Sequence, residues 1–439
     1  MLNLFLLYSN ATVDILSSLV CSHEVAFSRL NSIFPRMDLQ SILSSVLDEV
    51  YEKNEYPALA ALESEWTYTR PFDGFRVLVA TPIYRNTMTE YRALVAGGAD
   101  LLVGFSGMND PDVVDFMREW GVPVVTPAEM LEAESRGEFV DLVLDCAGPF
   151  AVLHPKIGFV ELTRSGVNYY KNAEKPVYVA DSGIVKRIET SLGTGDGYFR
   201  ALEKLGFGGD FEGKKLLVFG SGKVGSGIAL QGVRRGCNVT VVTDLKRGQS
   251  QTANSENAEH SAAPETMPAG DFSAVLEQND VAVVDCHDYA AVASLIENSD
   301  FVVTATGVKN ALAAPELTEA LLSTQANLAN MGVEDEYGES VPAEKVLNAK
   351  GPLNFILEEP THLKYIDTSL ALHAALAERL VQEAATLEDS SDAASAENSV
   401  GLRFPPQEIE QRLLTIAIQN GVIGPEICSM LGGIPTEMD

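Results

Sequence analysis

The chain has 439 residues, 46% of them hydrophobic, and a formal net charge of −31. This length suggests two or three domains, each large enough to bury an apolar core. A surface this acidic repels phosphate backbones, so we expect no binding to nucleic acid. The acidity is explained either by solubility alone or by adaptation to a salt-rich environment.

The five cysteines are dispersed and lack CxxC spacing, which favours a reduced cytoplasm without structural zinc. The apolar start, Met1–Leu7, has no basic flank and is too short to span a bilayer, so we expect no membrane attachment. Residues 1–70 form a predicted helical extension. Translation begins either at Met1 or at Met37, where Asp38 opens a cleaner helical run.

From residue 71 the chain alternates apolar strands with helices, which predicts a doubly wound parallel α/β sheet. The predicted strands are Arg76–Ala80, Asp100–Phe105, Val122–Thr126, Phe139–Leu144 and Val177–Ala180, and the predicted helices are Met88–Gly97 and Pro111–Trp120. In such sheets the functional site borders the carboxyl ends of the strands. Asp145 and Asp181 each follow a strand, so we expect both at that edge. This substrate domain is predicted over 71–191 and is completed by 355–386.

The apolar strand Leu216–Phe219 runs into Gly220-Ser221-Gly222-Lys223-Val224-Gly225, a GxGxxG motif, and a helical pattern follows. In this motif Gly220 allows the tight turn, Gly222 lets a pyrophosphate approach the backbone, and Gly225 lets helix and strand pack closely. The new helix N-terminus offers free N–H groups to phosphate oxygens. The motif therefore predicts a Rossmann dinucleotide-binding domain, which we place at 192–354.

A second strand, Cys237–Thr243, ends at Asp244, 19 residues after the last motif glycine. A carboxylate there accepts both ribose hydroxyls and repels a 2′-phosphate, so we expect NAD rather than NADP. The nearby Lys246 and Arg247 weaken that preference. Later strands are predicted at Val281–Val284, Phe301–Thr304 and Asn327–Ala329.

Three further segments complete the predicted organisation. Residues 246–271 are a low-complexity surface insertion, and residues 387–406 form an acidic, Ser/Ala-rich linker. A helix over Leu370–Ala385 closes the first domain. A helical tail over 407–439 is expected to dock on this chain or on a neighbouring one.

Several segments besides the glycine motif carry specific sequence. They are Leu144-Asp145-Cys146-Ala147-Gly148, Glu161-Leu162-Thr163-Arg164-Ser165-Gly166-Val167, Val179-Ala180-Asp181-Ser182, Thr304-Ala305-Thr306-Gly307, Asn330-Met331-Gly332 and Pro360-Thr361. In this order they resemble landmarks of the adenosylhomocysteinase family, and the similarity covers about Phe75 to Leu380.

The resemblance implies a substrate domain and an NAD domain in a homo-oligomer. It also implies an NAD-dependent cycle on a nucleoside thioether. In that cycle the ribose 3′-hydroxyl is oxidised, a base removes the acidified 4′ hydrogen, the thiolate leaves, water adds and the hydride returns. Such a cycle needs an acid/base group with a near-neutral pKa and polar anchors for the ribose.

The substrate-facing positions depart from the family pattern. Cys146 stands where the family has an aspartate, and Val185 stands where it has the catalytic lysine, with Lys186 one position along. Glu189-Thr190 only partly matches an Asp-Asn pair. Histidines of the family are replaced by Pro82, Glu359 and Val333, and a glutamate is replaced by Leu162. The same fold and cofactor acting on a different substrate is the simplest interpretation.

The candidate catalytic residues are Lys186, Glu161, Glu189 and Asp145. Each has a structural alternative: Asp145 could cap a helix, Glu161 could lie in a surface loop, and Lys186 could lie on a solvated helix face. The candidate cofactor-binding residues are Gly220, Gly222, Lys223, Val224, Gly225, Asp244, Thr163, Ser165, Thr306, Gly307, Met331, Gly332 and Asn354.

Other polar residues suggest structural roles. Asp367 could line the cleft between the domains, but it is rather expected to cap the helix that begins at Thr368. Cys146 is expected to be a small buried residue. No metal is predicted, because Asp285, His287 and Asp288 are near neighbours in sequence and are not expected to converge as ligands.

Together these observations favour an NAD-dependent, adenosylhomocysteinase-like enzyme. It would oxidise, transiently or net, a hydroxyl of a nucleoside-like or related small-molecule substrate. Two alternatives stay open: a simple NAD-dependent dehydrogenase, and a catalytically silent NAD-bound regulatory protein.

Overall fold

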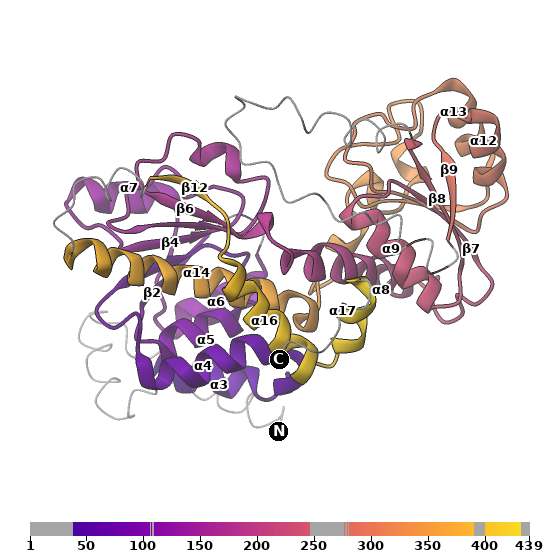
Figure 1. Cartoon of the computed structure of the whole chain (residues 1–439). Helices are drawn as coiled ribbons and strands as arrows, with labels where there is room; N and C mark the ends of the chain where they lie inside the picture. Colours follow the sequence, from indigo (N-terminus) through magenta and orange to yellow (C-terminus); the bar gives the residue numbers. More distant parts are fainter. Residues whose placement is uncertain are drawn as a thin grey trace, which may run out of the picture.

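The computed structural model describes residues 38–105, 107, 109–245, 276, 279, 281–389 and 400–431. They form two α/β domains, each built on a parallel sheet (Figure 1). All of the predicted insertion (246–271) and half of the predicted linker (387–406) lie outside the described residues. Within the described part of the chain, no helix combines the length and apolar character that crossing a membrane requires.

The first sheet has seven parallel strands in the order β12-β6-β5-β4-β1-β2-β3. Their bounds are β1 (Arg76–Val79), β2 (Asp100–Gly104), β3 (Val124–Val125), β4 (Leu142–Asp145), β5 (Gly158–Glu161), β6 (Pro176–Val179) and β12 (Gly401–Arg403). The inner strand β1 pairs with β2 and β4, and its Val77, Leu78 and Val79 are fully buried. Apolar side chains on both faces are what a parallel sheet covered by helices requires.

Two strands of this sheet were not predicted from the sequence. The strand β5 has four residues and ends in a glutamate, so it has the appearance of a polar loop. The strand β12 has only three residues, lies within the range predicted as a linker, and pairs with β6 through Gly401 and Pro176. With three residues, β12 is too short to show a periodic pattern.

Helices cover both faces of the first sheet (Figure 1). Their bounds are α3 (Leu39–Leu47), α4 (Pro57–Thr69), α5 (Met88–Ala96), α6 (Pro111–Glu119), α7 (Pro127–Ser135) and α14 (Leu363–Asp389). The Asp38 side chain caps α3 by accepting the N–H of Ser41. Trp66 of α4 is fully buried and meets the ring of Phe72 edge-on at 5.2 Å. This indole anchors the helical extension to the core.

The second sheet has five parallel strands in the order β11-β10-β7-β8-β9. Its elements are β7 (Lys215–Phe219), α9 (Lys223–Arg234), β8 (Asn238–Thr243), β9 (Ala282–Asp285), α12 (Tyr289–Glu297), β10 (Phe301–Thr304), α13 (Pro315–Ser323) and β11 (Asn327–Asn330). The glycine motif lies between β7 and α9, in the middle of the sheet. The predicted fold, two doubly wound α/β domains with a Rossmann second domain, is confirmed.

The chain crosses between the domains twice. It leaves the first through a wide π-helical turn, η4 (Ile188–Gly193), that runs straight into α8 (Thr194–Lys204), and it returns through α14. The tail helices α16 (Gln407–Asn420) and α17 (Gly424–Met430) pack on this same chain. Glu426 of α17 reaches Arg234 of α9 at 2.7 Å and accepts the Tyr365 hydroxyl at 3.0 Å. The tail therefore connects the two domains at their junction.

Asp367 caps a helix other than the expected one. It lies inside α14, is 1% exposed, and accepts the backbone N–H groups of Ala58 and Leu59, each at 2.9 Å. These N–H groups belong to the first turn of α4, where no partner exists within the helix. The prediction of a cap at the start of α14 was wrong, because α14 begins earlier, at Leu363.

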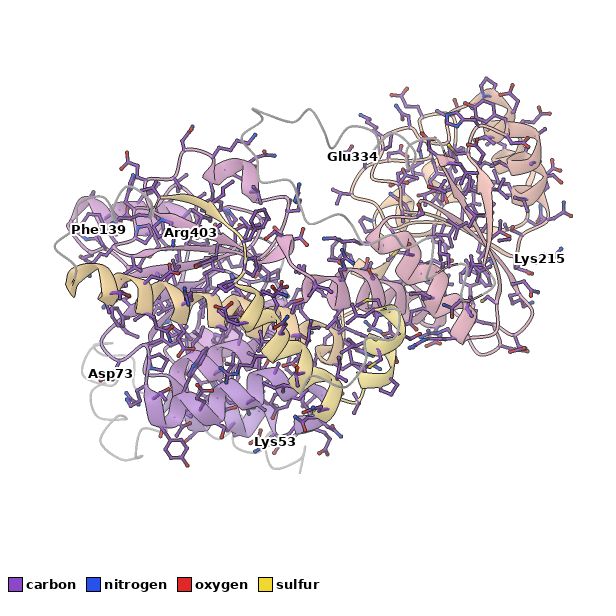
Figure 2. The ribbon with its side chains drawn as sticks, in the orientation of Figure 1. Lys53, Asp73, Phe139, Lys215, Glu334 and Arg403 are labelled. Atoms are coloured by element: carbon purple, nitrogen blue, oxygen red, sulfur yellow. The ribbon has the colours of Figure 1, made fainter. Side chains whose placement is uncertain are left out.

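Both sheets direct their carboxyl ends toward the other domain. Figure 2 labels Phe139, just before β4, at the end of the first domain far from the second. Lys215, at the start of β7, lies on the outer side of the second domain, and Glu334, just beyond β11, lies on its inner side. The edges where parallel sheets place their sites therefore face one another.

The burial of Asp367 predicts a pH-dependent stability. Burial raises the pKa of Asp367 to about 7, although the two N–H donors oppose the rise. A carboxyl whose pKa is higher in the folded than in the unfolded chain loses stabilisation as pH rises between the two values. We expect Asp367→Ala to destabilise the fold most near pH 4, and this destabilisation to shrink by up to about 4 kcal/mol by pH 8.

Urea unfolding of the wild type and the variant from pH 4 to pH 8 measures this trend. Asp38→Ala, which removes the exposed cap of α3, is the matched control for losing a helix cap. A destabilisation by Asp367→Ala that grows with pH would contradict the assignment.

Candidate active site

Asp145 ends β4 and is fully buried. One oxygen accepts the N–H of Cys146 at 2.8 Å, and the other accepts the N–H of Phe150 at 2.9 Å and the hydroxyl of Tyr170 at 2.6 Å. Burial raises the pKa of Asp145 to about 7, and these donors work against the rise. With both oxygens engaged, the geometry favours a capping role for Asp145 in the turn after β4 over a substrate contact.

Glu161 ends β5 beside Asp145 and is also fully buried. Its Oε1 accepts the N–H of Ala147 at 2.9 Å, and the N–H and hydroxyl of Thr163 at 2.7 and 2.6 Å. Its Oε2 has no hydrogen-bond partner among the described residues. Leaving a buried acceptor unpaired costs about 1–3 kcal/mol, so this oxygen is suited to accept a hydrogen bond from a ligand.

Thr163 and Ser165 follow Glu161 in sequence and lie nearer to solvent. Their hydroxyl oxygens lie 3.0 Å apart, with Thr163 half-buried and Ser165 exposed. Glu161 fixes Thr163 from beneath, so a ligand would meet a hydroxyl of defined orientation. This placement agrees with the predicted use of both residues, which stays a prediction.

Lys186 is a buried ammonium group. Its side chain is 3% exposed, and its Nζ donates to Glu189 Oε2 at 2.6 Å. Burial opposes the charged form, but Glu189 and Asp181 outweigh it and raise the pKa of Lys186 above its usual range. Lys186 therefore stays protonated at neutral pH, as a hydrogen-bond donor and a positive charge.

The four candidate catalytic residues all contribute to the electrostatic environment of the Cys146 thiol. Lys186, Glu161, Glu189 and Asp145 all act electrostatically on this buried group. Burial raises the pKa of Cys146 far above its usual range, and the charge of Lys186 opposes that rise. Cys146 is thus a neutral, buried side chain, and we call it and the four residues that act on it the Cys146 cluster.

The tail helix α16 positions the segment that carries Lys186. Glu410 accepts the N–H of Val185 at 3.0 Å, and a Cβ on Gly183 would overlap its carboxylate. Burial raises the pKa of Glu410, and backbone donors oppose this. Sequence reasoning missed Glu410, because it lies 225 residues from Val185 and no local pattern connects the two.

Asp181 and Lys223 join the two domains. Asp181 lies just beyond β6, and Lys223 is the first residue of α9. The Lys223 Nζ donates to Asp181 Oδ1 at 3.1 Å. Lys223 also belongs to the GxGxxG motif. Asp181 in turn raises the pKa of Lys186, so it interacts with both the motif and the Cys146 cluster.

The glycine motif has the geometry of a phosphate cradle. Gly220 has a φ of +104°, a left-handed conformation that disfavours other residues, and a Cβ on Gly225 would collide with the Gly220 carbonyl. A Cβ on Gly222 would meet open space, and no side chain caps α9 there. The first turn of α9 thus presents N–H groups to an open approach, so these residues fit a dinucleotide pyrophosphate.

The remaining cofactor candidates lie at the carboxyl ends of the same sheet. Asp244 follows β8, Thr306 and Gly307 follow β10, and Met331 and Gly332 follow β11. Met331 is buried, as is Asn354, which packs against α8 beside Gly197. Apart from Asn354, which lies in η7, these positions share the sheet edge with the glycine motif, and their contact with a cofactor stays a prediction.

Glu336 is a buried carboxylate that sequence reasoning missed. Its two oxygens accept the N–H groups of Thr306 and Gly307, at 2.9 and 2.7 Å, and the Thr306 hydroxyl at 2.7 Å. It thereby holds the loop after β10 in place. No motif surrounds Glu336, so only the folded arrangement reveals this role.

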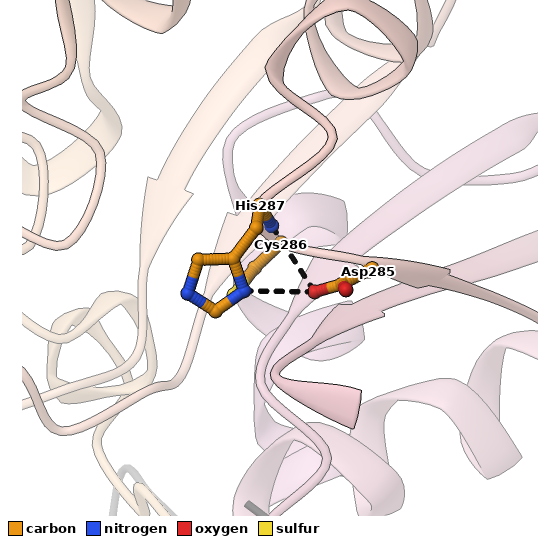
Figure 3. A group of neighbouring side chains, drawn as sticks. All are labelled: Asp285, Cys286 and His287. Atoms are coloured by element: carbon orange, nitrogen blue, oxygen red, sulfur yellow. Dashed lines mark hydrogen bonds and ion pairs between the residues drawn. The ribbon is translucent and has the colours of Figure 1, made fainter. Parts of the chain in front are cut away.

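Asp285 and His287 come together with Cys286 rather than with Asp288, the residue considered with them in the sequence. The ligand atoms of Asp285, Cys286 and His287 all lie within 4.8 Å of one another (Figure 3). The chain turns immediately after β9, which directs consecutive side chains to the same side. Asp288 instead caps α12 by accepting the N–H of Ala291.

Two surface hollows lie elsewhere. One of about 390 Å³ is lined by Leu39, Leu101 and Trp120 at the amino edge of the first sheet. The other lies beside α13. Neither is lined by a residue of the Cys146 cluster or of the glycine motif, so the polar chemistry and these hollows are separate features.

Comparison of the sequence with protein-family models and with curated proteins finds no match. Among solved structures, a dipicolinate synthase subunit from Bacillus halodurans is similar, with 12% identity and a TM-score of 0.45 over 71% of this chain and 99% of that chain. The transhydrogenase from Sinorhizobium meliloti is similar too, with 16% identity and a TM-score of 0.38 over 75% of this chain and 98% of that chain. Likeness at this level identifies no family and no activity, so the resemblance to adenosylhomocysteinase stays a prediction.

The open space at Gly222 makes the cofactor site testable without unfolding the protein. We expect Gly222→Val to fold normally and to lose NAD binding, because its side chain would fill the approach to the α9 N-terminus. Gly225→Val is the contrasting variant, since its side chain collides with the Gly220 backbone and should destabilise the fold. Calorimetric titration with NAD and thermal unfolding distinguish the two effects. Full NAD affinity in a folded Gly222→Val protein would show that the motif is not the cofactor site.

Proposed function

We propose that the protein is an NAD-dependent enzyme similar to adenosylhomocysteinase, acting on a hydroxyl of a nucleoside-like or related small molecule. The observation that carries this proposal is the Cys146 cluster, which Asp181 joins to Lys223 of the glycine motif. Buried ionisable groups gathered beside a cofactor motif are typical of an active site. A homo-oligomer in a reduced cytoplasm belongs to the same proposal and is supported by the family resemblance and the dispersed cysteines.

NAD, when bound at the motif, supplies a hydride acceptor for oxidation of the substrate hydroxyl. The N–H groups of the first turn of α9 would hold its pyrophosphate, and Asp244 would hold its adenosine ribose. NAD rather than NADP is supported by the charge of Asp244.

The residues of the Cys146 cluster have different proposed roles in proton transfer. Lys186, protonated and buried, would donate to a substrate oxygen on which negative charge develops. Glu161 would accept the hydroxyl proton at its unpaired Oε2. Glu189 orients Lys186, so we place it as a positioning residue rather than a base. The sequence names Lys186 and Glu189 as candidate catalytic residues without assigning them these roles.

A simple dehydrogenase is the second candidate, and one residue favours it. Val333 occupies a position where the adenosylhomocysteinase family has a histidine, and it is 92% exposed. An aliphatic side chain cannot transfer protons in the elimination and water-addition steps that follow oxidation. Loss of that histidine therefore favours a reaction that stops at oxidation and releases NADH.

Lys186 provides the sharpest test by mutation. We expect Lys186→Met, which keeps the length of the side chain but removes its charge, to lower kcat by about 100-fold or more while NAD affinity changes little. Lys214→Ala, at an exposed lysine in the second domain, is the matched control. Thermal unfolding checks the fold, since Glu189 loses its partner in the variant. Unchanged kcat would remove Lys186 from the mechanism.

Absorbance of the purified protein distinguishes the candidate functions. With adenosine or S-adenosylhomocysteine, a bound-NADH signal accompanied by product and no free NADH supports the transient cycle. Accumulation of free NADH with another alcohol supports the dehydrogenase. Failure of every hydroxyl substrate tested to reduce NAD would refute both, and would leave a silent NAD-bound regulatory protein.

A further inference from the structure

We propose that Asp285, Cys286 and His287 form a binding site for a divalent cation of the zinc class. The three side chains lie at the carboxyl end of β9, with all ligand atoms within 4.8 Å of one another (Figure 3). Carboxylate oxygen, thiolate sulfur and imidazole nitrogen together favour Zn²⁺ or Co²⁺ over Mg²⁺ or Ca²⁺. This site is separate from the Cys146 cluster and does not depend on the proposed function.

Two of the three ligand separations are close to those of tetrahedral coordination. The Cys286 Sγ lies 3.5 Å from His287 Nδ1. A tetrahedral zinc ion at about 2.3 Å from sulfur and about 2.0 Å from nitrogen separates these two ligands by about 3.5 Å. The Asp285 Oδ1 lies 2.9 Å from the same nitrogen, and it would need to move by about 0.5 Å to reach the tetrahedral spacing.

Hydrogen bonding alone accounts poorly for this convergence. The His287 Nδ1 faces both Asp285 Oδ1 and Cys286 Sγ, yet a ring nitrogen has either one proton or one lone pair. It can therefore make one good hydrogen bond, whereas a cation at the centre would satisfy all three atoms at once.

The backbone around the group holds it in place. The N–H of Cys286 donates to the Thr243 carbonyl of β8 at 2.9 Å, and the N–H of His287 donates to Asp285 at 3.2 Å. Asp288 fixes the following turn by capping α12. The side chains of His287 and Asp285 remain 50% and 29% exposed, so a cation and a completing water can enter.

The site lies beside the residue proposed to hold the adenosine ribose. Thr243 pairs with Asp285 across β8 and β9, and Asp244 is the next residue. A cation at Cys286 would offset the negative charge of Asp244 and Asp285. If NAD binds as in the proposed function, cation binding should also change the affinity for NAD; this consequence rests on that proposal.

Cobalt titration of the full-length, chelator-treated and reduced protein tests the site directly. We expect one Co²⁺ per chain, with visible bands typical of tetrahedral geometry and a near-ultraviolet sulfur-to-cobalt charge-transfer band. Cys286→Ser should abolish the charge-transfer band, and His287→Ala should weaken binding by about tenfold or more. Cys428→Ser, at a half-buried thiol of α17, is the matched control and should keep the band.

Two results would overturn the proposal. One is the absence of a charge-transfer band in the wild type, and the other is an unchanged band in Cys286→Ser. NAD affinity with and without Zn²⁺ is measured separately. A cobalt charge-transfer band without NAD binding would support the cation site and refute the proposed cofactor. NAD binding without that band would support the proposed cofactor and refute the cation site.

Discussion

The buried ammonium of Lys186 is the constraint from which the architecture of the site follows. A charge with 3% exposure is tolerated only where opposite charge compensates the loss of water, and Glu189 supplies it at 2.6 Å. Asp181 adds a second negative charge and is balanced in turn by Lys223 of the second domain. Moving Glu189 would leave Lys186 buried and without its ion-pair partner, and moving Lys223 would do the same for Asp181. The ion pairs therefore link the first domain, the glycine motif and the junction between the domains electrostatically.

Backbone hydrogen bonds fix the positions of these charges. Asp145, Glu161, Glu336 and Glu410 each accept backbone N–H groups in a loop beyond a strand end. Carboxylates used in this way hold loops rigid, and rigid loops allow a site to keep its geometry without a ligand. Only Glu161 retains a buried oxygen without a partner among the described residues of this group. Glu161 is therefore the one carboxylate of the four with an oxygen available to a substrate, whereas the other three hold the loops beyond the strand ends.

The sequence was informative where the pattern is local. The strand Phe301–Thr304 has its predicted bounds, and the GxGxxG motif lies between strand and helix as expected. Features that depend on contacts between distant segments could not be predicted. The three-residue β12 shows no periodicity, and the link from Glu410 to Val185 spans 225 residues. The convergence of Asp285, Cys286 and His287 depends on a turn whose direction the sequence does not state.

The central claim is that a dinucleotide bound at the motif directs its reactive end toward the Cys146 cluster. A crystal structure of the complex with NAD measures this directly. The account predicts the pyrophosphate at the N-terminus of α9 and the nicotinamide ring on the side of Asp181, within reach of Glu161 and Thr163. A nicotinamide ring turned toward the outer side of the second domain, or a dinucleotide bound away from Gly222, would contradict it.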